Sequence, residues 1–142
     1  MDCEHLLQQL GTAIGLDLRF SESNTCGVLF DNDEVIFEKN EGKLHLIAAL
    51  GPSAGRDDVC RRLLEANYLG AQTGFASIGL DSGREDFVLH RVLEGNMDYP
   101  EFEEAVTLFV RAARHWRKWL ANPQGAQEAS GERPFIPGGL QA

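Results

Sequence analysis

Histidines and serines are the side chains with which this sequence could most directly bind a metal ion or attack a substrate. The four histidines are His5, His45, His90 and His115. Each lies in a different predicted element, and no two have the i, i+4 spacing that places metal ligands on one helical face. No serine stands in the GxSxG motif of a nucleophile elbow. The spacing therefore predicts no metal site, no cofactor and no catalytic centre.

Two segments resemble ion-binding loops but lack residues that such loops require. Residues 31–34 begin like a calcium loop, yet Ile36 stands at the position where the turn needs glycine. Gly42 stands where the last carboxylate ligand is required. Residues 51–55 are rich in glycine but lack the GK[ST] ending of a phosphate-binding loop. We interpret 31–34 as a hairpin turn and 51–55 as a connection between a strand and a helix.

Charge and composition restrict the classes of partner. The chain has 142 residues and a mass of 15.7 kDa, the size of one domain. Its 13 Lys and Arg against 22 Asp and Glu give a net charge of −9, the wrong sign for nucleic acid or anionic membranes. No window approaches the ~20 apolar residues of a membrane span. Cys3, Cys26 and Cys60 form no CxxC pair, which favours free thiols in the cytoplasm.

The first half of the sequence predicts one helix and three strands. Apolar residues at three- and four-residue spacing predict a helix over 3–14, and Gly15 stands where a C-terminal cap is expected. Alternation with a period of two then predicts strands near 26–30, 35–37 and 44–50, with turns between them. Residues 16–20 could add a short extended piece.

The second half predicts helix, two strands and helix. Residues 56–69 have helical spacing, and 74–80 and 87–93 alternate as strands do. Asp98 can cap a last helix that Pro100 opens and Leu120 closes. The cationic side chains Arg111, Arg114, Arg117 and Lys118 are interpreted as a solvated face at the negative end of that helix. We assign residues 1–122 to the domain and 123–142 to a flexible Gly/Pro-rich tail.

The expected architecture is an α+β fold in which helices flank an antiparallel sheet. Several strands carry large apolar residues on both faces, such as Leu29 and Ile36 opposite Val28, Val35 and Phe37. Either helices cover both faces of the sheet, or the surplus apolar surface contacts a partner. The pattern alone favours neither explanation.

Several short stretches, taken in order, resemble the class I chaperones of bacterial type III secretion systems, the group that includes the Tir chaperone. They are LLQQLG at 6–11, CGVLFD at 26–31, LLEAN at 63–67, GLD at 79–81, and the stretch 109–120 with Trp116. Their order and spacing from about residue 3 to residue 120 carry the resemblance. The Gly/Pro-rich tail goes beyond this pattern.

The resemblance implies a homodimer in the bacterial cytoplasm that binds the N-terminal chaperone-binding segment of a secreted effector. Such a chaperone keeps the segment non-globular and secretion-competent without hydrolysing ATP, and can meet components of the secretion apparatus. The implied effector-binding residues are Leu6, Leu7, Leu10, Ile14, Val28, Phe30 and Phe37. The implied dimer interface contains Val59, Leu63, Asn67, Phe75, Ile78 and Leu80. Helical spacing adds the expectation that at least one of Leu6 and Leu7 is partly exposed.

Two other function classes remain open at this point. One is a dimeric scaffold or adaptor outside secretion, which a genomic neighbourhood without secretion genes would favour. The other is a small α+β enzyme with an unrecognised site, which an activity screen or bound small-molecule density would reveal.

Overall fold

The computed structural model describes residues 1–122, and the predicted tail at 123–142 lies outside the described residues. The elements are α1 (Cys3–Ile14), β1 (Thr25–Phe30), β2 (Asp33–Asn40), β3 (Lys43–Pro52), α2 (Cys60–Asn67), β4 (Ser77–Asp81), β5 (Asp86–Leu93) and α3 (Tyr99–Ala121). Two short 3₁₀ turns, η1 (Asp57–Val59) and η2 (Tyr68–Gly70), flank α2. The α+β class and the order of elements are confirmed.

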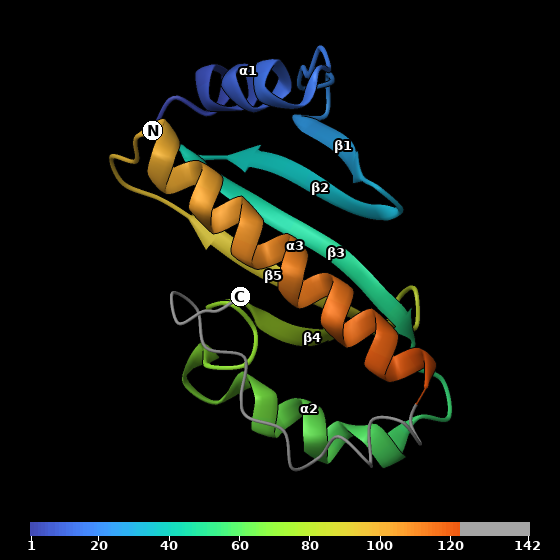
Figure 1. Ribbon diagram of the computed structural model, residues 1–142. Helices are drawn as coiled ribbons and strands as arrows, with labels where there is room; N and C mark the ends of the chain where they lie inside the picture. The colour runs from blue at the N-terminus through green and yellow to red at the C-terminus, as the bar shows by residue number, and fades with distance from the viewer. Residues whose placement is uncertain (123–142) are drawn as a thin grey trace.

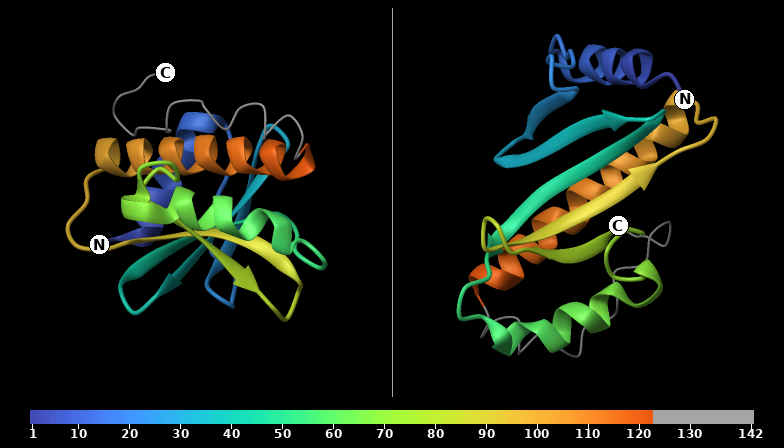
Figure 2. Two further views of the ribbon diagram at one scale, coloured as in Figure 1. Left: turned by 90° about the horizontal axis from the view of Figure 1, so that it is seen from below. Right: turned by 180° about the vertical axis from the view of Figure 1, so that it is seen from behind.

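The strands form one antiparallel sheet in the order β1-β2-β3-β5-β4, so β1 and β4 are its edges. Helix α3 crosses one face of the sheet, while α1 lies beyond the β1 edge and α2 beyond the β4 edge (Figure 1). No helix of the described residues covers the opposite face (Figure 2). We call this opposite surface the open face; the helices therefore do not cover both sides.

The core fills the space between α3 and the sheet. Phe102, Phe109 and Trp116 lie on one stripe of α3 and are buried, because their spacing keeps them on one side of a 3.6-residue turn. They pack over alternate strand residues such as Leu44 and Leu46, which point to the same side. This arrangement fixes which face of each strand is buried.

Two predicted helix ends are confirmed, the C-terminal end of α1 and the N-terminal end of α3. Gly15 has a left-handed φ of 78° and its N–H donates to the carbonyl of Gly11, which ends α1. At α3, the side chain of Asp98 accepts from the N–H of Glu101, and Glu101 reaches back to the N–H of Asp98. This capping box explains why α3 starts sharply after an irregular connection.

Three predicted elements differ from the structure. The helix expected over 56–69 is an eight-residue α2 between two 3₁₀ turns, and Leu69 has a positive φ of 58°. The strand expected from Gly74 begins only at Ser77, because Gly74 and Phe75 have positive φ values of 63° and 68°. A Cβ at Gly74 would lie 2.9 Å from the carbonyl oxygen of Leu108, so this turn packs tightly on α3. Residues 16–20 form no strand.

Candidate binding surfaces

The predicted binding residues on α1 mostly face the interior. Leu6 and Leu7 are 4% and 1% exposed, and Leu10 is also buried, whereas Ile14 is 39% exposed. The expectation that Leu6 or Leu7 reaches the surface is wrong, because the buried stripe of α1 is wide enough to include both neighbours. Of this group, only Ile14 offers substantial apolar surface in the single chain.

The predicted strand residues divide in the same way. Val28 and Phe37 are buried on the α3 side of the sheet, and Phe30 is partly buried there. Leu29 points to the open face and is 62% exposed. From the sequence, Leu29 was expected only as part of the surplus apolar surface, because alternation alone does not say which face of a strand is covered.

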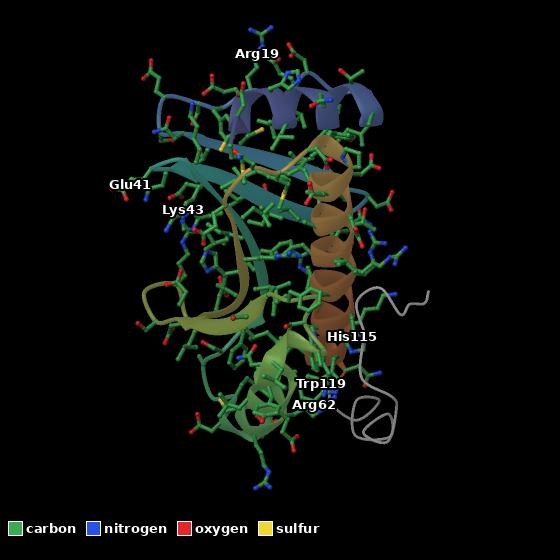
Figure 3. All side chains as sticks on the ribbon, turned by 90° about the vertical axis from the view of Figure 1, so that its left-hand side faces the viewer. Arg19, Glu41, Lys43, Arg62, His115 and Trp119 are labelled. Atoms are coloured by element: carbon green, nitrogen blue, oxygen red, sulfur yellow. The ribbon has the colours of Figure 1, made fainter. Side chains whose placement is uncertain are left out.

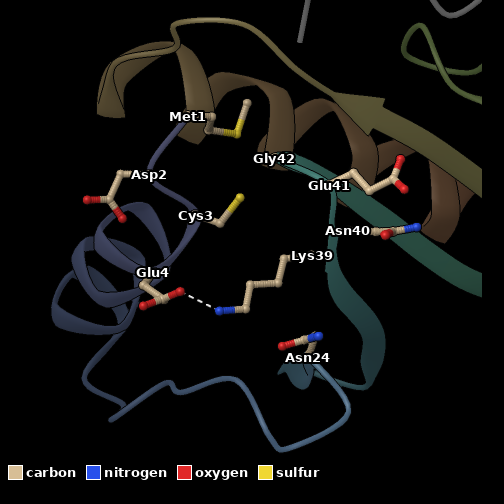
Figure 4. A pocket seen from close by; sticks show the side chains of 9 residues that line it. All are labelled: Met1, Asp2, Cys3, Glu4, Asn24, Lys39, Asn40, Glu41 and Gly42. Atoms are coloured by element: carbon tan, nitrogen blue, oxygen red, sulfur yellow. Dashed lines mark hydrogen bonds and ion pairs between the residues drawn. The ribbon is translucent and has the colours of Figure 1, made fainter.

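A groove runs between α1 and the neighbouring strands. A cavity of about 560 Å³ lies between the start of α1 and the β2–β3 turn (Figure 4). Lys39 of β2 and Glu4 of α1 form an ion pair in it. A second cavity of about 260 Å³ is also lined by Glu4 and Lys39, together with Leu7, Leu18 and Phe20. The ion pair thus adjoins both halves of the groove.

The two edges of the sheet differ. Strand β1 has β2 on one side only, and residues 25–30 include no charged residue and no proline. Ser21 bonds the outward backbone groups of Thr25: its N–H donates to the Thr25 carbonyl, and its Oγ accepts from the Thr25 N–H. Beyond Thr25, the edge lacks the charges and prolines that often discourage pairing with another strand. At the other edge, the Asn67 amide donates to the carbonyl of Ile78 (2.8 Å) and its oxygen accepts from the N–H of Ile78 (2.6 Å). Asn67 therefore closes β4 at Ile78, and β1 is left as the more open edge.

The predicted dimer residues near α2 separate into buried and exposed groups. Val59, Leu63 and Ile78 are buried within the single chain. Phe75 and Leu80 are exposed, and so are three apolar neighbours that were not among the predicted residues, Leu64, Tyr68 and Leu69. Together these residues, 57% to 80% exposed, form what we call the α2–β4 patch: Leu64, Tyr68, Leu69, Phe75 and Leu80. The adjacent leucines in the sequence were the available signal for Leu64.

Two arginines of α3 hold the β1–β2 hairpin instead of forming a solvated face. Arg114 Nε and Arg117 Nη1 donate to the two carboxylate oxygens of Asp33, at 2.6 Å and 2.7 Å. Arg117 also donates to the carbonyl oxygens of Glu34 and Ala49. Burial acts to raise the pKa of Asp33, but the two arginines outweigh it and lower that pKa below its ordinary value. The interpretation of Arg114 and Arg117 as simply solvated was wrong.

Two classes of feature are missing from the described part of the chain. Among residues 1–122, no group of three His, Cys, Asp or Glu side chains could hold a metal ion. None of the helices described there is long and apolar enough to span a membrane.

The described residues thus combine a groove beside α1, an open β1 edge and an exposed apolar patch in one α+β domain. The chain belongs to the Tir chaperone protein (CesT) family, whose model matches residues 5–117. No curated protein matches the sequence.

Solved structures share the fold. One of the similar structures is the ExsC–ExsE complex, with a TM-score of 0.69, 21% identity, and 83% of this chain and 96% of that chain covered. Another is the Yersinia pestis type III secretion chaperone SycH with a fragment of YscM2, with a TM-score of 0.62, 20% identity and coverage of 80% and 98%. The ExoU–SpcU complex of Pseudomonas aeruginosa has a TM-score of 0.65, 18% identity and coverage of 82% and 95%.

Proposed function

We propose that this protein is a cytoplasmic type III secretion chaperone that binds the N-terminal segment of a secreted effector. The observation that carries the proposal is membership of the Tir chaperone family over residues 5–117. One similar structure, HopA1–SchA, is a chaperone–effector complex. A chaperone family gives no reason to expect an enzyme. The surfaces on this chain supply a physical route for binding.

The segment binds along β1 and the groove beside α1. An extended peptide can add to a free sheet edge by main-chain hydrogen bonds while alternate side chains enter apolar pockets. Ile14 and Phe30 contact the segment directly, whereas the buried residues of the predicted set shape the groove from below. That set is Leu6, Leu7, Leu10, Val28 and Phe37. Bound in this way, the segment stays extended and cannot form its own core.

The active form is a homodimer that packs through the α2–β4 patch. The patch is apolar, exposed and continuous along α2, η2 and the β4 edge, which suits an isologous contact between identical surfaces. Because Asn67 occupies the backbone groups of Ile78, the two sheets meet through side chains and do not continue as one sheet at that residue. The buried residues Val59, Leu63 and Ile78 support the patch from within.

The test separates strand addition from simple contact at the β1 edge. In an antiparallel pair, the backbone groups of alternate residues point toward the neighbouring strand. The two-residue turn at 31–32 and the bond from the N–H of Lys39 to the carbonyl of Asn24 show that the even-numbered residues of β1 point toward β2. The N–H of Gly27 therefore points outward, away from β2. Gly27→Pro removes this donor, and Gly27→Ala keeps it while adding the same Cβ, which meets only the flexible end of Glu34.

Binding is measured by calorimetry with N-terminal segments of effectors encoded in the source bacterium. We expect Gly27→Ala to bind a cognate segment like the wild type and Gly27→Pro to bind at least tenfold more weakly, with unchanged thermal unfolding. Equal binding by both variants would exclude strand addition at β1. If no effector segment binds the wild-type protein, the proposed function itself is wrong.

A further inference from the structure

The open face of the sheet is unusually apolar for a surface that no helix covers. Ile36, Ile47, Val88 and Val92 all point to it and are partly exposed, and Leu29 is exposed beside them. Figure 3 shows α3 on one side of the strands, while Lys43 and Glu41 extend on the other side, where no described helix lies. A solvent-exposed sheet face is ordinarily polar, so the apolar character of this face suits it to contact with a partner.

Strand register places a histidine pair at the centre of this face. Ile36 pairs with Ile47, and Ile47 pairs with His90, so these residues form one row across β2, β3 and β5. His45 stands two residues before Ile47 and therefore points to the same face. Its ring Nδ1 lies 2.9 Å from Nε2 of His90.

The two rings share a hydrogen bond in one plane. Their planes differ by 9° and their centroids are 5.1 Å apart. The N···N distance of 2.9 Å is too short for rings lying face over face, since stacked atoms stay about 3.5 Å apart. One ring must therefore donate N–H to the lone pair of the other, which requires at least one neutral histidine.

This bond determines what the pair shows to a ligand. In the neutral pair, whichever ring donates, the two remaining nitrogens present one N–H donor and one acceptor. A peptide group also has one donor and one acceptor, so the neutral pair can bond an extended backbone. When the pair takes up a proton, both remaining nitrogens become donors and the acceptor is lost.

The surroundings of His90 favour its neutral form. Burial, assisted by the nearby His45, lowers the pKa of His90, and Glu38 on β2 opposes this shift. Ser77 of β4, the residue directly opposite His90, carries no charge. The other charged groups near this part of the face are Lys43 on β3 and Glu94 after β5, which lie 3.9 Å apart.

We propose that the open face is a second docking surface, on which an extended apolar stretch of the same effector lies with its backbone bonded to the neutral His45–His90 pair. This inference rests on the proposed function. Leu29 belongs to both β1 and the open face, so a segment added at the edge can continue onto it. The edge of the open face carries the acidic residues Glu34 and Glu38, and the positive charge of Lys43 is balanced by Glu94. Charge complementarity therefore favours an effector stretch flanked by basic rather than acidic residues.

Charge substitutions test the surface with the effector segment that binds the wild type. Ile47→Glu places a carboxylate at the centre of the open face, and Ala49→Glu does so at an exposed alanine of the same face, where folding is not at risk. Thr107→Glu makes the same charge change on the exposed side of α3 and serves as the matched control. We expect about tenfold weaker binding for the first two variants and wild-type binding for the control.

A pH comparison tests the histidine pair. We expect wild-type binding to weaken severalfold from pH 7.5 to pH 5.5. The side-chain amide in His90→Gln offers a donor and an acceptor but does not titrate. This variant should therefore bind at pH 7.5 and lose most of the pH dependence of binding. Equal pH dependence in both proteins would overturn the role of the pair.

The outcomes separate the two proposals. If Ile47→Glu and Ala49→Glu bind like Thr107→Glu while Gly27→Pro fails to bind, the open face is not a docking surface and the proposed function stands. If the two open-face variants become monomers, this face contacts a second copy and the inference is wrong. If the wild type binds no effector segment, both proposals fail.

Discussion

At the scale of single residues, contacts between distant elements did not follow from the sequence. The four histidines lie in different elements of the sequence, yet His45 and His90 meet across β3 and β5. Their meeting depends on the pairing of β3 with β5, which places His45 opposite Val92 and Ile47 opposite His90, and no local pattern specifies that register. Asp33 meets Arg114 and Arg117 for a similar reason, because the hairpin and α3 are distant in the sequence.

Asp33→Asn tests the ion pairs of Asp33 with Arg114 and Arg117. The substitution removes the countercharge of two arginines that are partly exposed, so we expect the free energy of unfolding to fall by about 2 kcal/mol at pH 7. Urea unfolding of the two proteins measures the difference. Asp31→Asn, at an exposed neighbour 3.5 Å from Arg114, should change stability by less than about 0.5 kcal/mol.

The same pair should give a defined acid dependence. Because the pKa of Asp33 is lowered in the folded protein, its contribution is fully present above the unfolded value of about 3.9 and is lost as the pH falls through the folded value. The stability difference between wild type and Asp33→Asn should therefore shrink in unfolding curves below pH 4. A difference that stays constant down to pH 2 would show that the carboxylate charge is not responsible.

At the scale of elements, local signals were sufficient for α1 and α3 but not for α2. Gly15 and the Asp98 capping box act within one helical turn, so the sequence alone shows them. The chain leaves α2 through Leu69 and Gly70, and a Cβ at Gly70 would lie 2.9 Å from Cα of Phe75. That close approach is a tertiary contact. The helical periodicity of the sequence continues past Asn67, so it does not show where α2 ends.

Asn67 is the link between α2 and β4, and its removal should loosen that edge. Asn67→Leu removes both bonds to Ile78 and leaves two buried backbone groups unpaired, which we expect to cost about 2 to 3 kcal/mol of stability. Asn67→Asp keeps the acceptor for the Ile78 N–H and loses only the donor. Hydrogen exchange at the Ile78 amide should accelerate in the leucine variant and much less in the aspartate variant. Slow exchange in both would show that the edge is closed by other contacts.

At the scale of the whole molecule, the order of elements indicated the fold, while the position of each layer did not follow from the sequence. Alternation in β1 to β3 placed apolar residues on both faces, and only the structure shows that α3 covers one face and leaves Leu29 and Ile36 on the other. Likewise, the predicted binding residues were chosen for apolar character, which buried and exposed positions share. The surfaces that remain uncovered in the single chain, including the α2–β4 patch, are therefore the ones that assembly must explain.

Assembly through the α2–β4 patch predicts that the wild-type protein sediments at twice the 15.7 kDa chain mass at micromolar concentration. Leu80→Asp places a charge within the patch, where the side chain is 63% exposed, so the single chain should fold normally and the dimer should dissociate. Leu16→Asp introduces the same charge at a 50% exposed leucine next to α1, at the opposite end of the molecule, and should leave the dimer intact. Sedimentation equilibrium with circular dichroism separates loss of assembly from loss of fold. If Leu16→Asp dissociates the dimer and Leu80→Asp does not, the two copies meet at the α1 end, and the groove beside α1 is covered by the second chain instead of an effector.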